Sequence, residues 1–137
     1  MITEQGREYR EQLIGDGYCH VPGVAPLDLI EQTRVFSERL VDGLEEDDAR
    51  RRHLQGSLIR VNDLEEMVPM IILPAAIEVL NNMGFPNPKY YNGYIISKPP
   101  EASPPPLFWH QDGVTWDEPI SYTDTPAQVF LMYYLVD

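Results

Sequence analysis

The chain has 137 residues, 43% of them apolar, which is enough for one domain with a hydrophobic core and short for two. Ten basic against 22 acidic residues give a net charge of −12, which disfavours nucleic acids and anionic membranes as partners. One cysteine excludes an internal disulfide, and the charged N-terminus lacks the apolar core of a signal peptide. The longest apolar stretch, residues 68–80, is interrupted by prolines and is too short to span a bilayer. These features predict a soluble, cytoplasmic protein.

Helix signals dominate the first half of the sequence. Thr3 can cap a first helix, which Gly15 and Gly17 are expected to end. A second helix should begin near residues 26–28, where a proline and an acid suit a first turn. Apolar residues at helical spacing then predict one buried face, formed by Leu29, Phe36, Leu40 and Leu44.

A third helix is predicted over residues 75–83, ended by Gly84. The remaining apolar segments are β-branched or aromatic and predict strands. The last of them is apolar on both faces, which favours a buried central strand. A proline-dense loop, residues 98–106, lies between two of these segments. The predicted strands cover residues 18–21, 89–98, 107–112 and 128–136, and residues 58–63 are predicted as a short strand or an extended segment.

The order of helices before strands indicates an α+β fold in a single domain, residues 1–137. Residues 1–88 form the mainly helical segment, and residues 89–137 supply the first strands of a larger all-β unit.

His110 and Asp112 are the first candidates for chemistry. Residues two apart in a strand point to the same face, so both side chains can bind one metal ion. An imidazole and a carboxylate are two-thirds of the facial triad that holds non-heme Fe(II). Taken alone the spacing is weak, and a structural or capping role is the alternative.

The surrounding sequence is more specific. The stretch YNGYIISKPPEASPPPLFWHQDG, followed by a tryptophan, a proline and QVFLMYYLVD, resembles the phytanoyl-CoA dioxygenase family of Fe(II)/2-oxoglutarate oxygenases. The N-terminal GYCHVPGVAPLDLIEQTRVF is similar to the opening segment of that family. The resemblance implies helices packed on a double-stranded β-helix, or jelly roll. It also implies His110 and Asp112 as iron ligands, with 2-oxoglutarate and O2 as cosubstrates.

The activity implied is hydroxylation of an unactivated C–H bond in a small organic substrate, coupled to decarboxylation of 2-oxoglutarate to succinate. By the same resemblance, the residues expected to contact 2-oxoglutarate are Tyr94, Lys98, Tyr133 and Arg60, and those facing the primary substrate are Gln111 and Trp116.

Each assignment has a structural alternative. Tyr94 and Tyr133 suit a core as well as a pocket, and Lys98 suits a solvated strand end. Arg60 can pair with Asp63 or Glu65 instead of binding a ligand. Gln111, in turn, can hydrogen-bond to the backbone.

The sequence departs from the family pattern in its third ligand. The family has a distal histidine and then an arginine for the far carboxylate of 2-oxoglutarate, yet no histidine follows His110 and no Lys or Arg follows Lys98. His20 and His53 lie in the segment expected outside the barrel. We therefore expect an N-terminal part of a dioxygenase with an incomplete jelly roll. A non-catalytic, degenerate jelly-roll binding protein is the alternative, and a cupin-like metal enzyme is a third.

An N-terminal part with two iron ligands should bind iron weakly and should not turn over. The purified chain, supplied with Fe(II), 2-oxoglutarate and O2, is expected to form no succinate. Iron-dependent succinate formation, measured against a metal-free control, would show that these 137 residues hold a complete site.

Overall fold

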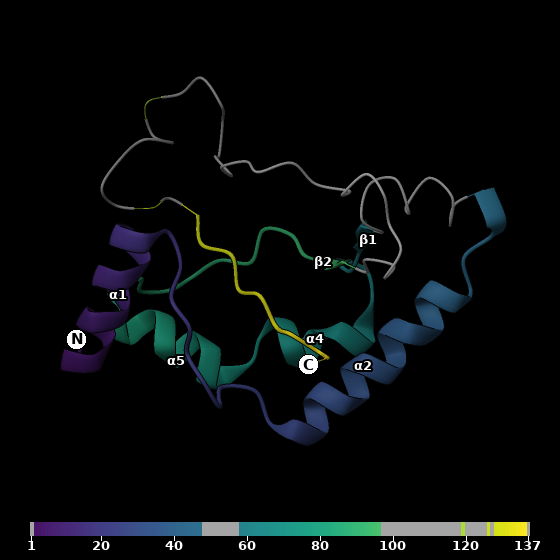
Figure 1. The fold of residues 1–137 in the computed structure, drawn as a ribbon, viewed down its shortest axis with the longest axis horizontal. Coiled ribbons are helices and arrows are strands. Elements are labelled where there is room, and N and C mark those ends of the chain that lie inside the picture. The colour runs from purple at the N-terminus through teal and green to yellow at the C-terminus, as the bar shows by residue number, and fades with distance from the viewer. Residues whose placement is uncertain (1, 48–57, 97–118, 120–125, 127, 137) are drawn as a thin grey trace. The chain divides into compact units, whose positions relative to one another are not determined.

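A computed structural model describes residues 2–47, 58–96, 119, 126 and 128–136 (Figure 1). In these parts of the chain the helices are α1 (Glu4–Asp16), α2 (Leu27–Asp42), the short α4 (Val68–Ile71) and α5 (Pro74–Asn82), with a 3-10 turn η1 (Glu65–Met67) before α4. Strands β1 (Leu58–Arg60) and β2 (Tyr94–Ile96) form a two-stranded antiparallel sheet. No helix among these is long and apolar enough to cross a membrane.

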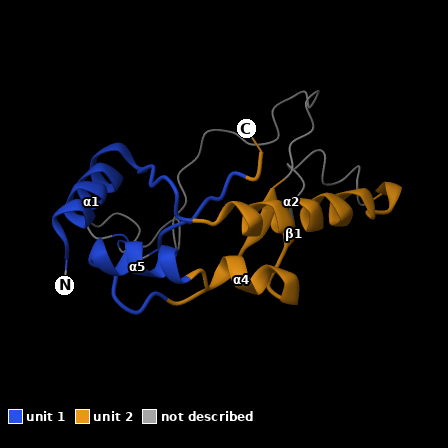
Figure 2. Cartoon of the chain, turned by 90° about the horizontal axis from the view of Figure 1, so that it is seen from below, with its two compact units in different colours: residues 1–24, 74–88, 110–134 blue, residues 25–73, 89–109, 135–137 orange. Residues whose placement is uncertain are grey.

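The chain divides into two compact units, coloured separately in Figure 2. Unit 1 comprises residues 1–24, 74–88 and 110–134, and contains α1 and α5. Unit 2 comprises residues 25–73, 89–109 and 135–137, and contains α2, the sheet and α4. Each unit is therefore assembled from segments that are distant in sequence.

Helix α1 of unit 1 has well-defined ends. The Thr3 hydroxyl accepts a hydrogen bond from the Gly6 N–H at 3.0 Å, which satisfies one of the free donors of the first turn. Gly17 ends the helix with φ +81°, a conformation that glycine adopts without steric cost. Gly15, the other predicted stop, lies inside the helix.

Helix α1 packs against α5 and covers its C-terminus. The Thr3 N–H donates to the Asn82 carbonyl at 3.3 Å, and Arg10 Nη1 donates to the Met83 carbonyl at 3.2 Å. The Arg10 guanidinium also lies 4.6 Å from the centre of the Phe85 ring. Because the last carbonyls of a helix have no partner within it, α1 caps α5 with main-chain and side-chain donors.

Helix α2 of unit 2 begins after Pro26 and carries an acid, Asp28, in its first turn. Two hydroxyl side chains on its buried face donate hydrogen bonds to main-chain carbonyls of the same helix. The Thr33 hydroxyl donates to the Leu29 carbonyl and the Ser37 hydroxyl to the Thr33 carbonyl, both at 2.7 Å. These bonds let a polar pair lie inside the protein without an unpaired group.

The core of unit 2 lies between α2 and one face of the sheet. Its buried side chains are Ile59, Val61, Met67 and Ile95, and the apolar residues packed against them are Phe36, Leu40, Val41, Leu44, Leu64 and Ile71. The predicted buried face of α2 is thus confirmed for Phe36, Leu40 and Leu44.

The three predicted helices are confirmed, with α5 followed by Gly84 at φ +86°. The Phe85 N–H donates to the Leu80 carbonyl at 2.9 Å and the Gly84 N–H to the Asn81 carbonyl at 3.0 Å. This pairing is the Schellman motif that glycine permits after a helix. Helix α4 differs from the sequence expectation, in which Pro69 interrupts the apolar stretch; the proline lies in the first turn of the helix, where it is tolerated.

Two strand predictions are wrong. Residues 18–21 form no strand, because Gly17 and Gly23 (φ +71°) turn the chain on either side and no strand among the described residues pairs with them. Residues 128–136 also form no strand, and Phe130, Leu131 and Met132 are exposed instead of buried. A strand requires a hydrogen-bonded neighbour, and apolar composition does not supply one.

The segments predicted over 58–63 and 89–98 do pair, through the shorter β1 and β2. The described parts of the chain therefore form a mainly helical structure with one two-stranded antiparallel sheet, and no jelly roll is present in them. The strand predicted over 107–112 lies outside the described residues.

The contact between α1 and α5 predicts a large effect at Gly6. A methyl group there would overlap the Asn82 carbonyl, which is backbone and cannot rotate away. We expect Gly6→Ala to lower the free energy of unfolding by about 2 kcal/mol, measured by urea denaturation. Gly15→Ala is the matched control, because it lies in the same helix with open space around it, and should raise stability by about 0.5 kcal/mol. Equal effects of the two substitutions would contradict this packing.

Candidate functional site

The outer face of the sheet brings two predicted cosubstrate residues together. In the observed register Arg60 lies opposite Tyr94, and Ile59 lies opposite Ile95. Side chains alternate along a strand, so the burial of Ile59 and Ile95 directs Arg60 and Tyr94 to the other face. Arg60 is exposed there, and Tyr94 is 47% exposed. Directly opposed residues on one face are about 5 Å apart at Cβ, within reach of one small ligand.

The Arg60 guanidinium has no ion-pair partner among the described residues. The alternative pairing with Asp63 or Glu65 is therefore not observed. The charge of Arg60 acts on Tyr90. Burial raises the pKa of Tyr90, and the positive charge of Arg60 opposes that rise. Tyr94 and Asp63 act in the same direction as burial.

Tyr94 is held by a polar neighbour. The Asn92 Nδ2 donates to the Tyr94 hydroxyl at 3.4 Å, a long hydrogen bond that leaves the phenol proton available to another acceptor. Ile96 follows on the same face and is 53% exposed. The described side chains on this face are therefore a cation, a phenol and an apolar group: Arg60, Tyr94 and Ile96.

Asn62, just beyond β1, fixes the edge of this surface. Its Oδ1 accepts hydrogen bonds from the Gly93 N–H at 3.2 Å and from the Tyr90 hydroxyl at 3.1 Å. Sequence reasoning missed this residue. The Asn-Asp pair in LIRVND was available as a turn signal, but its partner at Gly93 is distant in sequence.

Tyr133 is the third predicted cosubstrate residue that the structure describes. Its hydroxyl is buried, and no hydrogen-bond partner for it lies among the described residues. Burial raises the pKa of Tyr133, which keeps the phenol protonated. A buried hydroxyl with no partner costs about 1–3 kcal/mol, so an oxygen acceptor from a ligand would relieve it.

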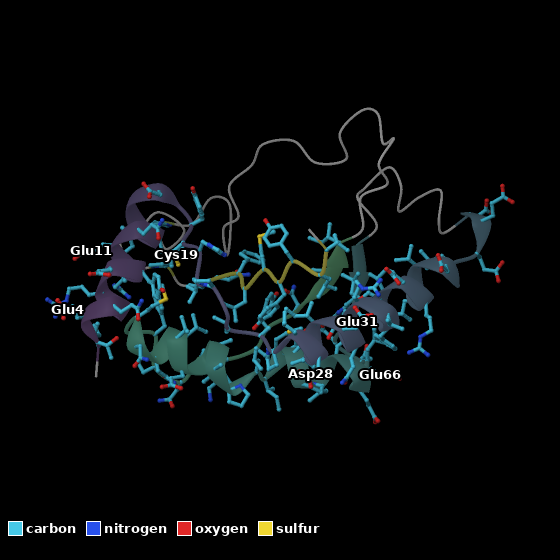
Figure 3. The ribbon with its side chains drawn as sticks, turned by 60° about the horizontal axis from the view of Figure 1, so that its bottom comes forward. Glu4, Glu11, Cys19, Asp28, Glu31 and Glu66 are labelled. Carbon is cyan, nitrogen blue, oxygen red and sulfur yellow. The ribbon has the colours of Figure 1, made fainter. Side chains whose placement is uncertain are left out.

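The other predicted site residues lie outside the described residues: His110, Gln111, Asp112, Trp116 and Lys98. Among the residues that are described, no three His, Cys, Asp or Glu side chains gather to hold a metal. Acids such as Glu4 and Glu11 on α1 are exposed and point outward (Figure 3). His20 is exposed as well, and burial raises the pKa of the neighbouring Cys19, which disfavours a reactive thiolate.

Comparison of the whole chain with protein-family models, with curated proteins and with solved structures gives no match.

The unpaired hydroxyl of Tyr133 predicts that its removal stabilises the protein. Tyr133→Phe should raise the free energy of unfolding by about 1 kcal/mol at neutral pH, because an unsatisfied polar group is lost. The substitution should also change the alkaline limb of the stability profile. The folded pKa of Tyr133 is raised, so the unfolded chain releases its proton first and stability falls as pH rises above about 10.

Urea unfolding at neutral pH and above about pH 10 measures both effects. Tyr134→Phe is the control, since Tyr134 is 77% exposed and should change neither quantity. A loss of stability in Tyr133→Phe would mean that the hydroxyl is used within the folded chain.

Proposed function

We propose that this chain is part of a non-heme Fe(II)/2-oxoglutarate-dependent dioxygenase of the phytanoyl-CoA dioxygenase type, acting on a small organic substrate. His110 and Asp112 hold the iron in this proposal. Arg60, Tyr94, Tyr133 and Lys98 contact 2-oxoglutarate, and Gln111 and Trp116 face the primary substrate.

The observation that carries the proposal is the register of the sheet. It pairs Arg60 with Tyr94 on an open face, leaves the guanidinium without a carboxylate partner among the described residues, and leaves the phenol proton free to donate. A guanidinium binds a carboxylate through two parallel hydrogen bonds, and a phenol can donate a third.

The distribution of basic residues supports the same assignment. After residue 52 the only Lys and Arg residues are Arg60, Lys89 and Lys98. Arg60 lies in β1, and Lys98 follows β2 by two positions in the sequence. In a protein with net charge −12, an anion needs local positive charge to bind at all.

The donor set suits the metal. A neutral imidazole and a carboxylate are ligands that Fe(II) accepts, and bound iron would supply the activation of O2. In the proposal the residues of the chain hold the metal through His110 and Asp112. Arg60 and Tyr94 orient a carboxylate of the cosubstrate.

The two faces of the sheet support the finer fold assignment. Ile59 and Ile95 pack toward the apolar face of α2, while Arg60 and Tyr94 face away from it. In a jelly roll with helices outside, β1 and β2 would be two of the strands. Their apolar face would pack on the helices, and the face with Arg60 and Tyr94 would point into the barrel. We propose that arrangement for the complete fold.

The proposal is tested by binding. Anaerobic calorimetric titration of the chain with Fe(II), and then with 2-oxoglutarate, measures the two affinities separately. We expect His110→Ala and Asp112→Ala each to weaken iron binding at least about tenfold, and His20→Ala, an exposed histidine, to leave it unchanged. Arg60→Ala should weaken 2-oxoglutarate binding about tenfold or more, since a charged hydrogen bond is worth about 1.5–3 kcal/mol.

Equal iron affinity in the wild type, His110→Ala and Asp112→Ala would refute the metal assignment. Binding of 2-oxoglutarate that does not depend on iron would favour the non-catalytic binding protein instead.

A further inference from the structure

The ladder between β1 and β2 is extended by a side chain. Beyond the Arg60–Tyr94 pair, the Val61 N–H donates to the Gly93 carbonyl at 3.1 Å. In a regular antiparallel pair the Gly93 N–H would donate back to the Val61 carbonyl. That carbonyl instead accepts from the Leu64 N–H at 3.1 Å, in the turn that follows β1. The Gly93 N–H donates to Asn62 Oδ1 at 3.2 Å, so the asparagine replaces the missing main-chain acceptor.

A second hydrogen bond fixes the asparagine itself. The Tyr90 hydroxyl donates to the same Oδ1 at 3.1 Å, which ties the segment before β2 to the turn after β1. Gly93 leaves room for this approach, because a Cβ there would lie 2.9 Å from the Tyr90 hydroxyl oxygen and 3.0 Å from Val61 Cγ2, so a larger residue would have to displace these side chains. Asn62, Tyr90 and Gly93 together form what we call the register clamp.

The register clamp matters because the sheet is short. Three residue pairs form it, and a pair of strands this small does not specify its own register strongly. A slip of β2 by one residue along β1 would turn Tyr94 toward the core and Ile95 outward, and would separate the Tyr94 phenol from Arg60. Asn62 lies two residues from Arg60, and Gly93 is adjacent to Tyr94, so the clamp acts directly beside the pair.

We propose that Asn62 is a positioning residue for the anion-binding pair Arg60 and Tyr94, acting through the Gly93 amide with Tyr90 as its second partner. The inference rests on the proposed function for the identity of the anion, 2-oxoglutarate. Asn62 touches no ligand in this proposal. It keeps the guanidinium and the phenol on one face and in one register.

The test uses Asn62→Leu, which removes the acceptor at similar size, and Asn62→Asp, which keeps an acceptor oxygen. Tyr90→Phe removes one of the two hydrogen bonds and is the milder variant. Asn81→Leu is the matched control, because Asn81 is exposed on α5 in unit 1. For each variant the iron affinity, the 2-oxoglutarate affinity, the urea midpoint and the hydrogen exchange of the Gly93 amide are measured.

We expect Asn62→Leu to weaken 2-oxoglutarate binding about tenfold, with iron binding unchanged and faster exchange at Gly93. Asn62→Asp should restore the protection of the Gly93 amide, because it keeps an acceptor oxygen. It should restore only part of the 2-oxoglutarate affinity, because its negative charge near Arg60 opposes the binding of an anion. Tyr90→Phe should fall between the wild type and Asn62→Leu, and Asn81→Leu should match the wild type.

Three outcomes overturn the inference. If Arg60→Ala weakens 2-oxoglutarate binding but Asn62→Leu does not, the positioning role alone is wrong. If Asn62→Leu lowers iron affinity, 2-oxoglutarate affinity and the urea midpoint together, Asn62 supports folding in general and not the pair. If the wild type binds no 2-oxoglutarate, the proposed function and this inference fail together.

Discussion

The burial of Ile59 and Ile95 against α2 is the constraint on which the rest of unit 2 depends. Ile59 of β1 and Ile95 of β2 are buried in the core, so their described neighbours Arg60 and Tyr94 take the opposite face. The apolar face of α2 thereby decides which side of the sheet meets solvent. Arg60 and Tyr94 therefore lie on the solvent face because their neighbours in the strands are buried, and no contact of their own is needed to place them there.

The described arginines of unit 2 differ in the partners of their guanidinium groups. Arg34 forms ion pairs with Glu31 and Glu38 on the exposed side of α2, and its hydrogen bond lowers the pKa of Glu31. Arg39 lies 5.9 Å from the centre of the Phe36 ring. Among the described arginines of this unit, Arg60 is the one with neither an ion pair nor an aromatic ring as its partner. Exposed ion pairs such as those of Arg34 add little stability, so their main effect here is to neutralise acids near the helix.

Local signals made the helices predictable, and the absence of local information limited the strands and the site. Thr3, Gly17 and Gly84 act on residues within one turn, so their effect is readable from sequence. Residues 128–136 have as strong a strand composition as β2 but pair with no strand among the described residues, which no local pattern reveals. Arg60 and Tyr94 were identified by resemblance, whereas their opposition depends on hydrogen bonds to Gly93 that join distant segments. His110 and Asp112 lie outside the described residues, so their arrangement stays a prediction.

The interleaving of the two units has a consequence for synthesis on the ribosome. Helix α1 emerges first, but α5, against which it packs, emerges only after residues 25–73 of unit 2 have been made. During that interval α1 lacks its contact with α5, and an isolated helix of 13 residues is marginal in water. Neither unit can be produced alone by cutting the chain at one point, because each draws on both sides of the other. Neither unit has all of its segments until part of the other has been synthesised, so the order of the chain links the folding of the two units.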